Sequence, residues 1–200
     1  MDLFAQAFVT ILVVMDPMGT APVFLSLTAD KTPAERHRAA MQATAVAASV
    51  VYVFALFGQE ILHLLGISVD ALEVAGGLIL VLDALELLHA PLGAGGKLGA
   101  SANVAFVPLG TPLLAGPGAV AATMVYVRRA QGFGGVVAVI GALAAVLLIV
   151  YLSMRFAGGL RRLLRDNGIE ITSRVVGLLL AAIAVQMVAT GVQVWVRHGV

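Results

Sequence analysis

The stretch Val14-Met15-Asp16-Pro17-Met18-Gly19-Thr20-Ala21-Pro22 interrupts an apolar run that otherwise extends from Leu3 to Leu27. Proline has no backbone N–H, and its ring clashes with the carbonyl four residues before it, so Pro17 frees the carbonyl of Val13. Gly19 permits backbone conformations that other residues avoid. The stretch therefore predicts a break about 13 residues into a helix. Because a helix rises by about 1.5 Å per residue, this break lies near the middle of the apolar run.

The composition of the chain places this break in a membrane. Of its 200 residues, 60% are hydrophobic and 12% are charged, and the mean hydropathy is +1.03. A soluble domain of this length cannot bury so much apolar surface. The absence of cysteine excludes disulfides and thiolate metal sites, and no basic run is long enough to bind nucleic acid. Because Met1-Asp2-Leu3 carries no positive charge, we expect no cleaved signal peptide.

Six segments are long and apolar enough to cross a bilayer, which takes a helix of about 20 residues. The connections between them are short and rich in Pro, Gly and charged residues, as in the expected exposed loops 30–36, 93–97 and 161–168. The predicted spans are 4–28, 39–64, 69–89, 104–127, 133–157 and 175–196.

The basic residues predict how these spans are oriented. Lys and Arg near span ends stay on the cytoplasmic side of a membrane. Nine of the 12 basic residues lie at the first, third and fifth connections, and the other side has only Arg128, Arg129 and Arg197. We therefore expect these three connections in the cytoplasm and both termini outside.

A second break lies 100 residues after the first. A shift of 100 places Asp16-Pro17-Met18-Gly19 on Gly116-Pro117-Gly118-Ala119, and residues 75–80 on 175–180. Three spans per half is an odd number, so the second half enters the membrane in the opposite sense, as in inverted-repeat transporters. We predict an all-α membrane protein in which 1–98 and 99–200 are inverted three-helix repeats of one transmembrane domain. The first and fourth of its six helices are broken at mid-membrane; the alternative is a chance coincidence of Gly and Pro.

The two breaks predict a cavity near the bilayer midplane, because unpaired backbone at that depth needs protein or water as a partner. The half-helix that begins at each break offers N–H groups, and the half-helix that ends there offers carbonyls. A zwitterionic amino acid suits both ends. The predicted substrate-binding residues are Asp16, Pro17, Gly19, Thr20, Gly116, Pro117 and Gly118.

Each break also has an interpretation without a ligand. Asp16 before Pro17 is a favoured N-cap, and it either also serves as a charged partner for an ammonium group or a cation, or only caps the helix. The second break has no acidic residue, so either its backbone recognises the ligand or it is a kink used for packing.

Acidic residues of the third span and glycines of the third and sixth spans are further candidates for a role in transport. Asp83 is the deepest acid of the third span and a candidate for proton coupling, the alternative being a solvated rim with Glu86 and His89. Asp70 and Glu73 fall near the outer end of the same span. Small residues in the third and sixth spans either bring these helices close to the substrate or only pack them together. They are Gly76, Gly77 and Gly177.

The sequence lacks the motifs of an enzyme. It has no nucleophile elbow, no His-rich metal motif and no phosphate loop, and Glu60 with His63 falls short of a metal site. We therefore expect no enzyme activity, no cofactor and no bound metal.

Several motifs together resemble the MarC family of integral membrane proteins, over essentially the whole chain. The resemblance implies a multi-pass protein of the cell inner (plasma) membrane and, for some members, transport of small neutral amino acids such as glycine and alanine. The motifs that carry it are residues 16–24, 57–58, 65–68, 74–80, 112–119 and 176–186.

These observations predict a secondary transporter of a small neutral amino acid, coupled to a proton or a sodium ion and embedded in the lipid bilayer. They leave a homo-oligomer open and predict no nucleic-acid partner. The alternative is a non-transporting inner-membrane protein with a scaffold or assembly role, in which both breaks serve packing.

Overall fold

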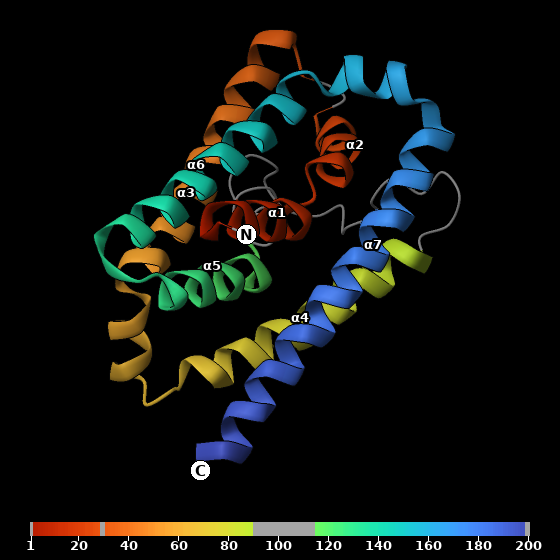
Figure 1. Ribbon diagram of the computed structural model, residues 1–200. Coiled ribbons are helices and arrows are strands. Elements are labelled where there is room, and N and C mark those ends of the chain that lie inside the picture. Colours follow the sequence, from red (N-terminus) through yellow and green to blue (C-terminus); the bar gives the residue numbers. More distant parts are fainter. Residues whose placement is uncertain (1, 29–30, 90–114, 199–200) are drawn as a thin grey trace.

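The computed structural model describes residues 2–28, 31–89 and 115–198, and every regular element among these is an α-helix (Figure 1). The helices are α1 (Leu3–Met15), α2 (Pro17–Leu27), α3 (Pro33–Leu64), α4 (Val69–His89), α5 (Pro117–Arg129), α6 (Gly132–Arg155) and α7 (Ala157–His198).

Four helical stretches among the described residues are long and apolar enough to cross a membrane. They are Leu3–Ala21, Pro33–Leu64, Gly132–Arg155 and Arg174–Val194, which correspond to the predicted first, second, fifth and sixth spans. Helix α4 fills the predicted third span but contains four acidic residues. Of the predicted fourth span, the described part is the 13-residue α5 with the turn before it, and the expected loop 93–97 lies outside the described residues.

The prediction of an exposed loop at 161–168 is wrong. This segment is helical and belongs to α7, which runs from Ala157 to His198. It contains no proline, and Leu and Arg are good helix formers, so nothing in it forces the backbone out of a helix. Figure 1 shows that the first turns of α7, in light blue, run across the end of the molecule before the helix turns along α4.

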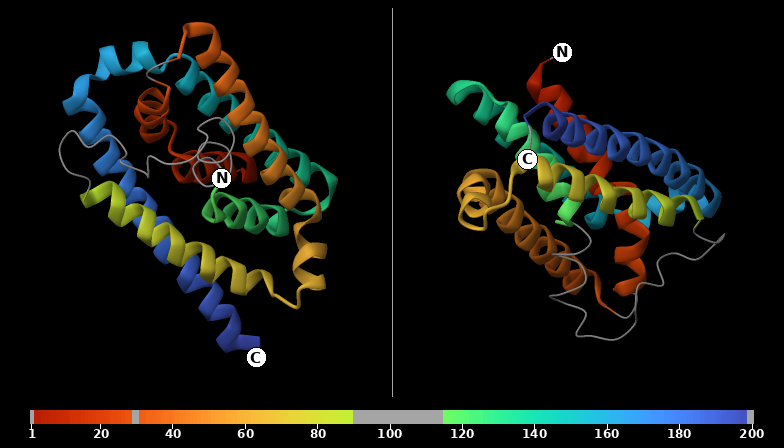
Figure 2. Two further views of the ribbon diagram at one scale, coloured as in Figure 1. Left: turned by 180° about the vertical axis from the view of Figure 1, so that it is seen from behind. Right: turned by 90° about the horizontal axis from the view of Figure 1, so that it is seen from below.

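Helices α4 and α7 pack side by side along much of their length, and they form the most extensive helix pair of the described chain (Figures 1 and 2). A methyl group added to Gly77 would lie 2.8 Å from the carbonyl oxygen of Ala184. One added to Gly177 would lie 3.3 Å from the carbonyl oxygen of Ala84. The two contacts are reciprocal, since each partner of one is 100 residues from its counterpart in the other.

The shorter helices make most of their contacts with the other half of the chain. Helix α2 packs against α6 and α7, whereas α5 packs against α3 and α4. Helix α1 likewise lies mainly on α6. Among the described residues, contacts between 1–98 and 99–200 therefore predominate over contacts within either part.

Buried side chains form two main groups in the described core, and a third, small group joins Leu62 of α3 to Val120 and Met124 of α5. The larger group joins α1, α2, α3, α5 and α6, and its fully buried members include Ile11, Val51 and Val146. The smaller group joins α4 and α7 through Leu80 and Leu180, with Ala121 of α5 against them. The α4–α7 pair is thus packed separately from the helices around α6, and α2 and α5 contact both groups.

Candidate functional site

The first helix break lies at Asp16. This residue ends α1 and begins α2 with φ 38° and ψ 70°, in the left-handed region, where it is the only described residue other than glycine. Its N–H donates to the carbonyls of Leu12 and Val13 at 3.1 and 3.3 Å, so the carbonyl that Pro17 frees finds a partner. Helix α2 continues through Pro22, so the chain breaks once here rather than twice.

Asp16 acts as the N-cap of α2. Its Oδ1 accepts from the N–H of Gly19 at 3.0 Å, and Pro17 occupies the first helical position. A methyl group on Gly19 would lie 3.0 Å from Cγ of Asp16, so glycine makes room for the capping carboxylate. Thr20 donates its hydroxyl to the carbonyl of Met15 at 3.3 Å, which ties the start of α2 to the end of α1.

The second break has the same outline without a side-chain cap. Gly116 is the N-cap residue of α5, with φ −60° and ψ 162°, and Pro117 is the first helical residue. The N–H groups of Ala119 and Val120 both donate to the carbonyl of Gly116, at 3.0 and 3.2 Å. A methyl group on Gly118 would lie 2.7 Å from Cγ of Leu80, so this glycine lets α5 approach α4.

The structure brings the two breaks into one core. Met15 and Ala21, on either side of the first break, belong to the same buried group as Ala115 and Ala119, on either side of the second. Thr20 is buried as well. The residues that flank the two breaks therefore belong to one buried group, although the breaks are 100 residues apart in the sequence.

The residues predicted to support the site lie on the α4–α7 pair. Gly76, Gly77 and Gly177 are buried, and the last two make the reciprocal contacts between these helices. Asp83 is exposed on α4, beside the buried Ala84. The glycines therefore pack helices together in this structure, and Asp83 lies outside the core.

Two ion pairs join α4 to α5, and sequence reasoning missed both. Arg128 donates through Nη1 to Oδ1 of Asp70, and Arg129 places Nη2 3.6 Å from Oε1 of Glu73. Glu73, which the sequence placed near the outer end of its span, is buried here, with only 6% of its side chain exposed. The available signal was two acids spaced i, i+3 near one span end and two consecutive arginines near another.

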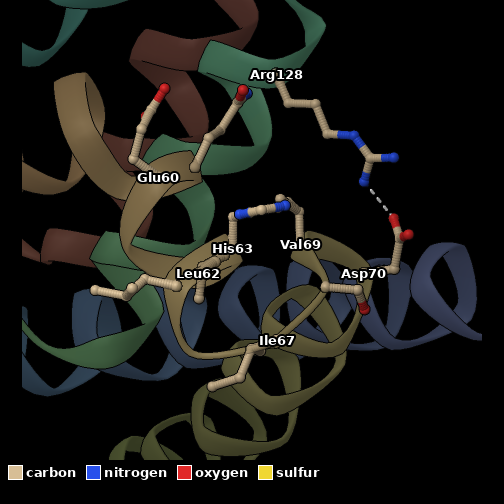
Figure 3. Close-up of a pocket in the computed structure, with 10 residues that line it drawn as sticks. Glu60, Leu62, His63, Ile67, Val69, Asp70 and Arg128 are labelled. Atoms are coloured by element: carbon tan, nitrogen blue, oxygen red, sulfur yellow. Dashed lines mark hydrogen bonds and ion pairs between the residues drawn. The ribbon is translucent and has the colours of Figure 1, made fainter.

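An open pocket of about 1060 Å³ lies beside these pairs, between the end of α3, the start of α4 and Arg128 (Figure 3). Glu60 and His63, which are three residues apart in the sequence, both line it. Over residues 2–28, 31–89 and 115–198, no three His, Asp or Glu side chains gather in a way that could hold a metal ion.

The sequence model of the family described as "MarC family integral membrane protein" matches residues 1–196. The chain belongs to the MarC family. The resemblance seen in the proline-glycine motifs is thereby confirmed, and the chain is a membrane protein of this family.

Relatives match this MarC family chain from end to end. A UPF0056 membrane protein of Methanocaldococcus jannaschii is 38% identical over 96% of this chain and 98% of its own length. The UPF0056 inner membrane protein MarC of Citrobacter koseri is 34% identical over 96% of each chain. The UPF0056 membrane protein YhcE of Escherichia coli is 30% identical over 95% of this chain and 92% of its own. No solved structure matches the chain.

Proposed function

We propose that this MarC family protein is a secondary transporter of small neutral amino acids of the glycine and alanine class, coupled to a proton or a sodium ion. The observation that carries the proposal is the pair of helix breaks at Asp16 and Gly116, each followed by proline at the first helical position and both packed in one core group. Two half-helices with opposed ends suit a zwitterionic ligand.

The proposed architecture is six membrane-spanning helices in two inverted repeats, 1–98 and 99–200. The reciprocal contacts of Gly77 and Gly177 support it, because a twofold relation pairs residue i with j and the counterpart of i with the counterpart of j. The matching roles of α2, which contacts α6 and α7, and α5, which contacts α3 and α4, support it as well. We place the protein in the cell inner membrane with both termini outside.

The proposed binding surface is the backbone around 16–20 and 116–118. Asp16 already caps α2, so its carboxylate has a structural role whether or not it also meets the ligand's ammonium group. Asp83 stays the proposed group for proton coupling, and it lies at an exposed position of α4.

Uptake into proteoliposomes tests the function. Saturable flux of glycine, alanine or serine under an imposed proton or sodium gradient is expected. If none of the three substrates shows flux under either gradient, the proposal fails. A non-transporting scaffold protein is then the better supported function, because the glycines between α4 and α7 can serve packing alone.

A pair of variants separates binding at Gly118 from packing. Gly118→Ala alone adds a methyl group against Leu80, so any loss of flux has two explanations. Leu80→Ala with Gly118→Ala removes that collision and keeps the added methyl group at the break. Flux that stays low in a folded double variant supports binding here, whereas flux that returns to the level of Leu80→Ala alone rejects Gly118 as a site residue.

A further inference from the structure

The end of α5 is attached to the α4–α7 pair by charge. Asp70 and Glu73 lie on the first turns of α4, one turn apart, and meet Arg128 and Arg129 on the last turn of α5. Both carboxylates are largely removed from water, with 14% and 6% of their side chains exposed, whereas the arginines are about half exposed.

Arg129 is held in place from its own side as well. Its guanidinium lies 5.7 Å from the centre of the Tyr126 ring, and the hydroxyl of Tyr126 is 2.8 Å from that of Thr10 in α1. A chain of contacts therefore runs from Glu73 through Arg129 and Tyr126 to Thr10. It connects the α4–α7 pair to the core around α1 and α6.

The corresponding end of α2 is attached differently. The position 100 residues before Arg128 is Thr28, whose carbonyl accepts from Nε of Arg36 in α3 at 2.9 Å. Helix α2 is thereby fastened to α3 at this point, whereas Arg128 fastens α5 to α4. The ends of α2 and α5 are related by the repeat in sequence but differ in their charge contacts.

We propose that Asp70–Arg128 and Glu73–Arg129 form a charge latch that holds the α4–α7 pair against α5 at one end, and that opening the latch connects the core between the breaks to the adjoining pocket. The inference rests on the proposed transport function, for which it names the gate. Asp70 and Arg128 of the latch line the pocket themselves, at the end of the molecule that the basic residues predict to be extracellular.

Because the 200-residue sequence contains no cysteine, a single introduced thiol allows a direct test. Ala121 is fully buried where α5 meets α4 and α7, so Ala121→Cys places one thiol behind the latch. In membranes, its reaction with a small water-soluble maleimide measures opening. Arg128→Gln with Arg129→Gln should raise the rate by about tenfold, as expected for a closed state weakened by about 1.4 kcal/mol.

A charge exchange checks that the pair, and not the arginine stems, is responsible. Either Asp70→Arg or Arg128→Asp alone removes the attraction across the seam and should raise the labelling rate. The two changes together restore the attraction and should bring the rate back toward that of Ala121→Cys alone. A matched thiol at Ala142, fully buried in α6, should stay unreactive in every background. An unchanged rate at position 121 in the neutralised variant, or no recovery on exchange, overturns the latch.

Salt provides the same test without altering the latch, in case the neutralised variants do not fold. The arginines are about half exposed, and raising the salt from about 0.1 M to about 1 M shortens the screening length from about 10 to about 3 Å. The thiol at 121 should then react faster, and an unchanged rate rejects the latch. Labelling needs no flux, so a protein that transports nothing can still show the latch, and one that transports can lack it.

Discussion

At the scale of single residues, Asp16 and Gly19 form one structural unit. The carboxylate caps α2 through the N–H of Gly19, and only a residue without a side chain leaves it room. The sequence showed both residues and proposed the cap among two interpretations. It could not show that the aspartate itself adopts the left-handed backbone, because that choice depends on how α1 and α2 are fixed in the core.

The cap makes a graded prediction for stability. Asp16→Ala should lower the free energy of unfolding by about 0.5–2 kcal/mol, whereas Asp16→Asn should stay close to the parent because Asn is an equally good N-cap. Gly19→Ala should resemble Asp16→Ala, since its methyl group displaces the carboxylate. Thermal unfolding in detergent, followed by circular dichroism, measures the series. Gly134→Ala, which meets nothing within 4 Å, is the control.

The hydroxyl pair of Thr10 and Tyr126 makes a second residue-scale prediction. Tyr126 is buried, and its hydroxyl is 2.8 Å from that of Thr10. Tyr126→Phe should cost about 0.5–1.5 kcal/mol of stability. A double-mutant cycle with Thr10→Val isolates the interaction, and a coupling energy near zero would show that the two hydroxyls do not depend on each other.

At the scale of helices, the sequence predicted element type better than element ends. Apolar runs predicted the helices that became α3, α4 and α6, and the Pro-Gly breaks predicted where α2 and α5 begin. It failed at 161–168, where charge and glycine suggested a loop that the structure makes helical. Charged residues accompany both loops and solvated helix turns, so composition alone does not separate them.

The close α4–α7 contact predicts unequal effects of two equivalent substitutions. Gly77→Ala brings a methyl group to 2.8 Å from a carbonyl oxygen, whereas the nearest atoms to a methyl group at Gly177 lie at 3.2 Å. Gly77→Ala should therefore destabilise by about 1–3 kcal/mol and Gly177→Ala by less. Unfolding midpoints rank them, with Gly158→Ala on α7, which meets nothing within 4 Å, as the control. Equal midpoints for all three would contradict close packing here.

At the scale of the whole molecule, the sequence could predict a repeat but not how its halves pack. A shift of 100 residues aligns the breaks and the glycines, yet it contains no information on which helices touch. The same applies to the ion pairs of α4 and α5, whose partners are 58 residues apart for Asp70 and Arg128. Contacts between distant segments follow from the packing of all helices at once, so local patterns reveal the residues and not their partners.

The six-span proposal makes a parity prediction that needs no transport. Ala34 and Gln131 are exposed near the starts of α3 and α6, and three proposed spans separate them. In intact cells, a membrane-impermeant maleimide should label Gln131→Cys, and it should reach Ala34→Cys only after permeabilisation. Labelling of both from the same side would reject the odd number of spans, and the reverse pattern would reject the proposed orientation alone.

The preference of α1, α2 and α5 for partners in the other half has a consequence for biosynthesis. The amino-terminal half leaves the ribosome first, yet the surfaces on which α1 and α2 rest belong to α6 and α7, which are made last. Until α6 and α7 are synthesised, the packing faces of α1 and α2 must therefore contact lipid or an insertion factor. Each half-chain should accordingly be degraded when it is expressed alone. The two should accumulate when they are expressed together, because each provides the packing partners of the other.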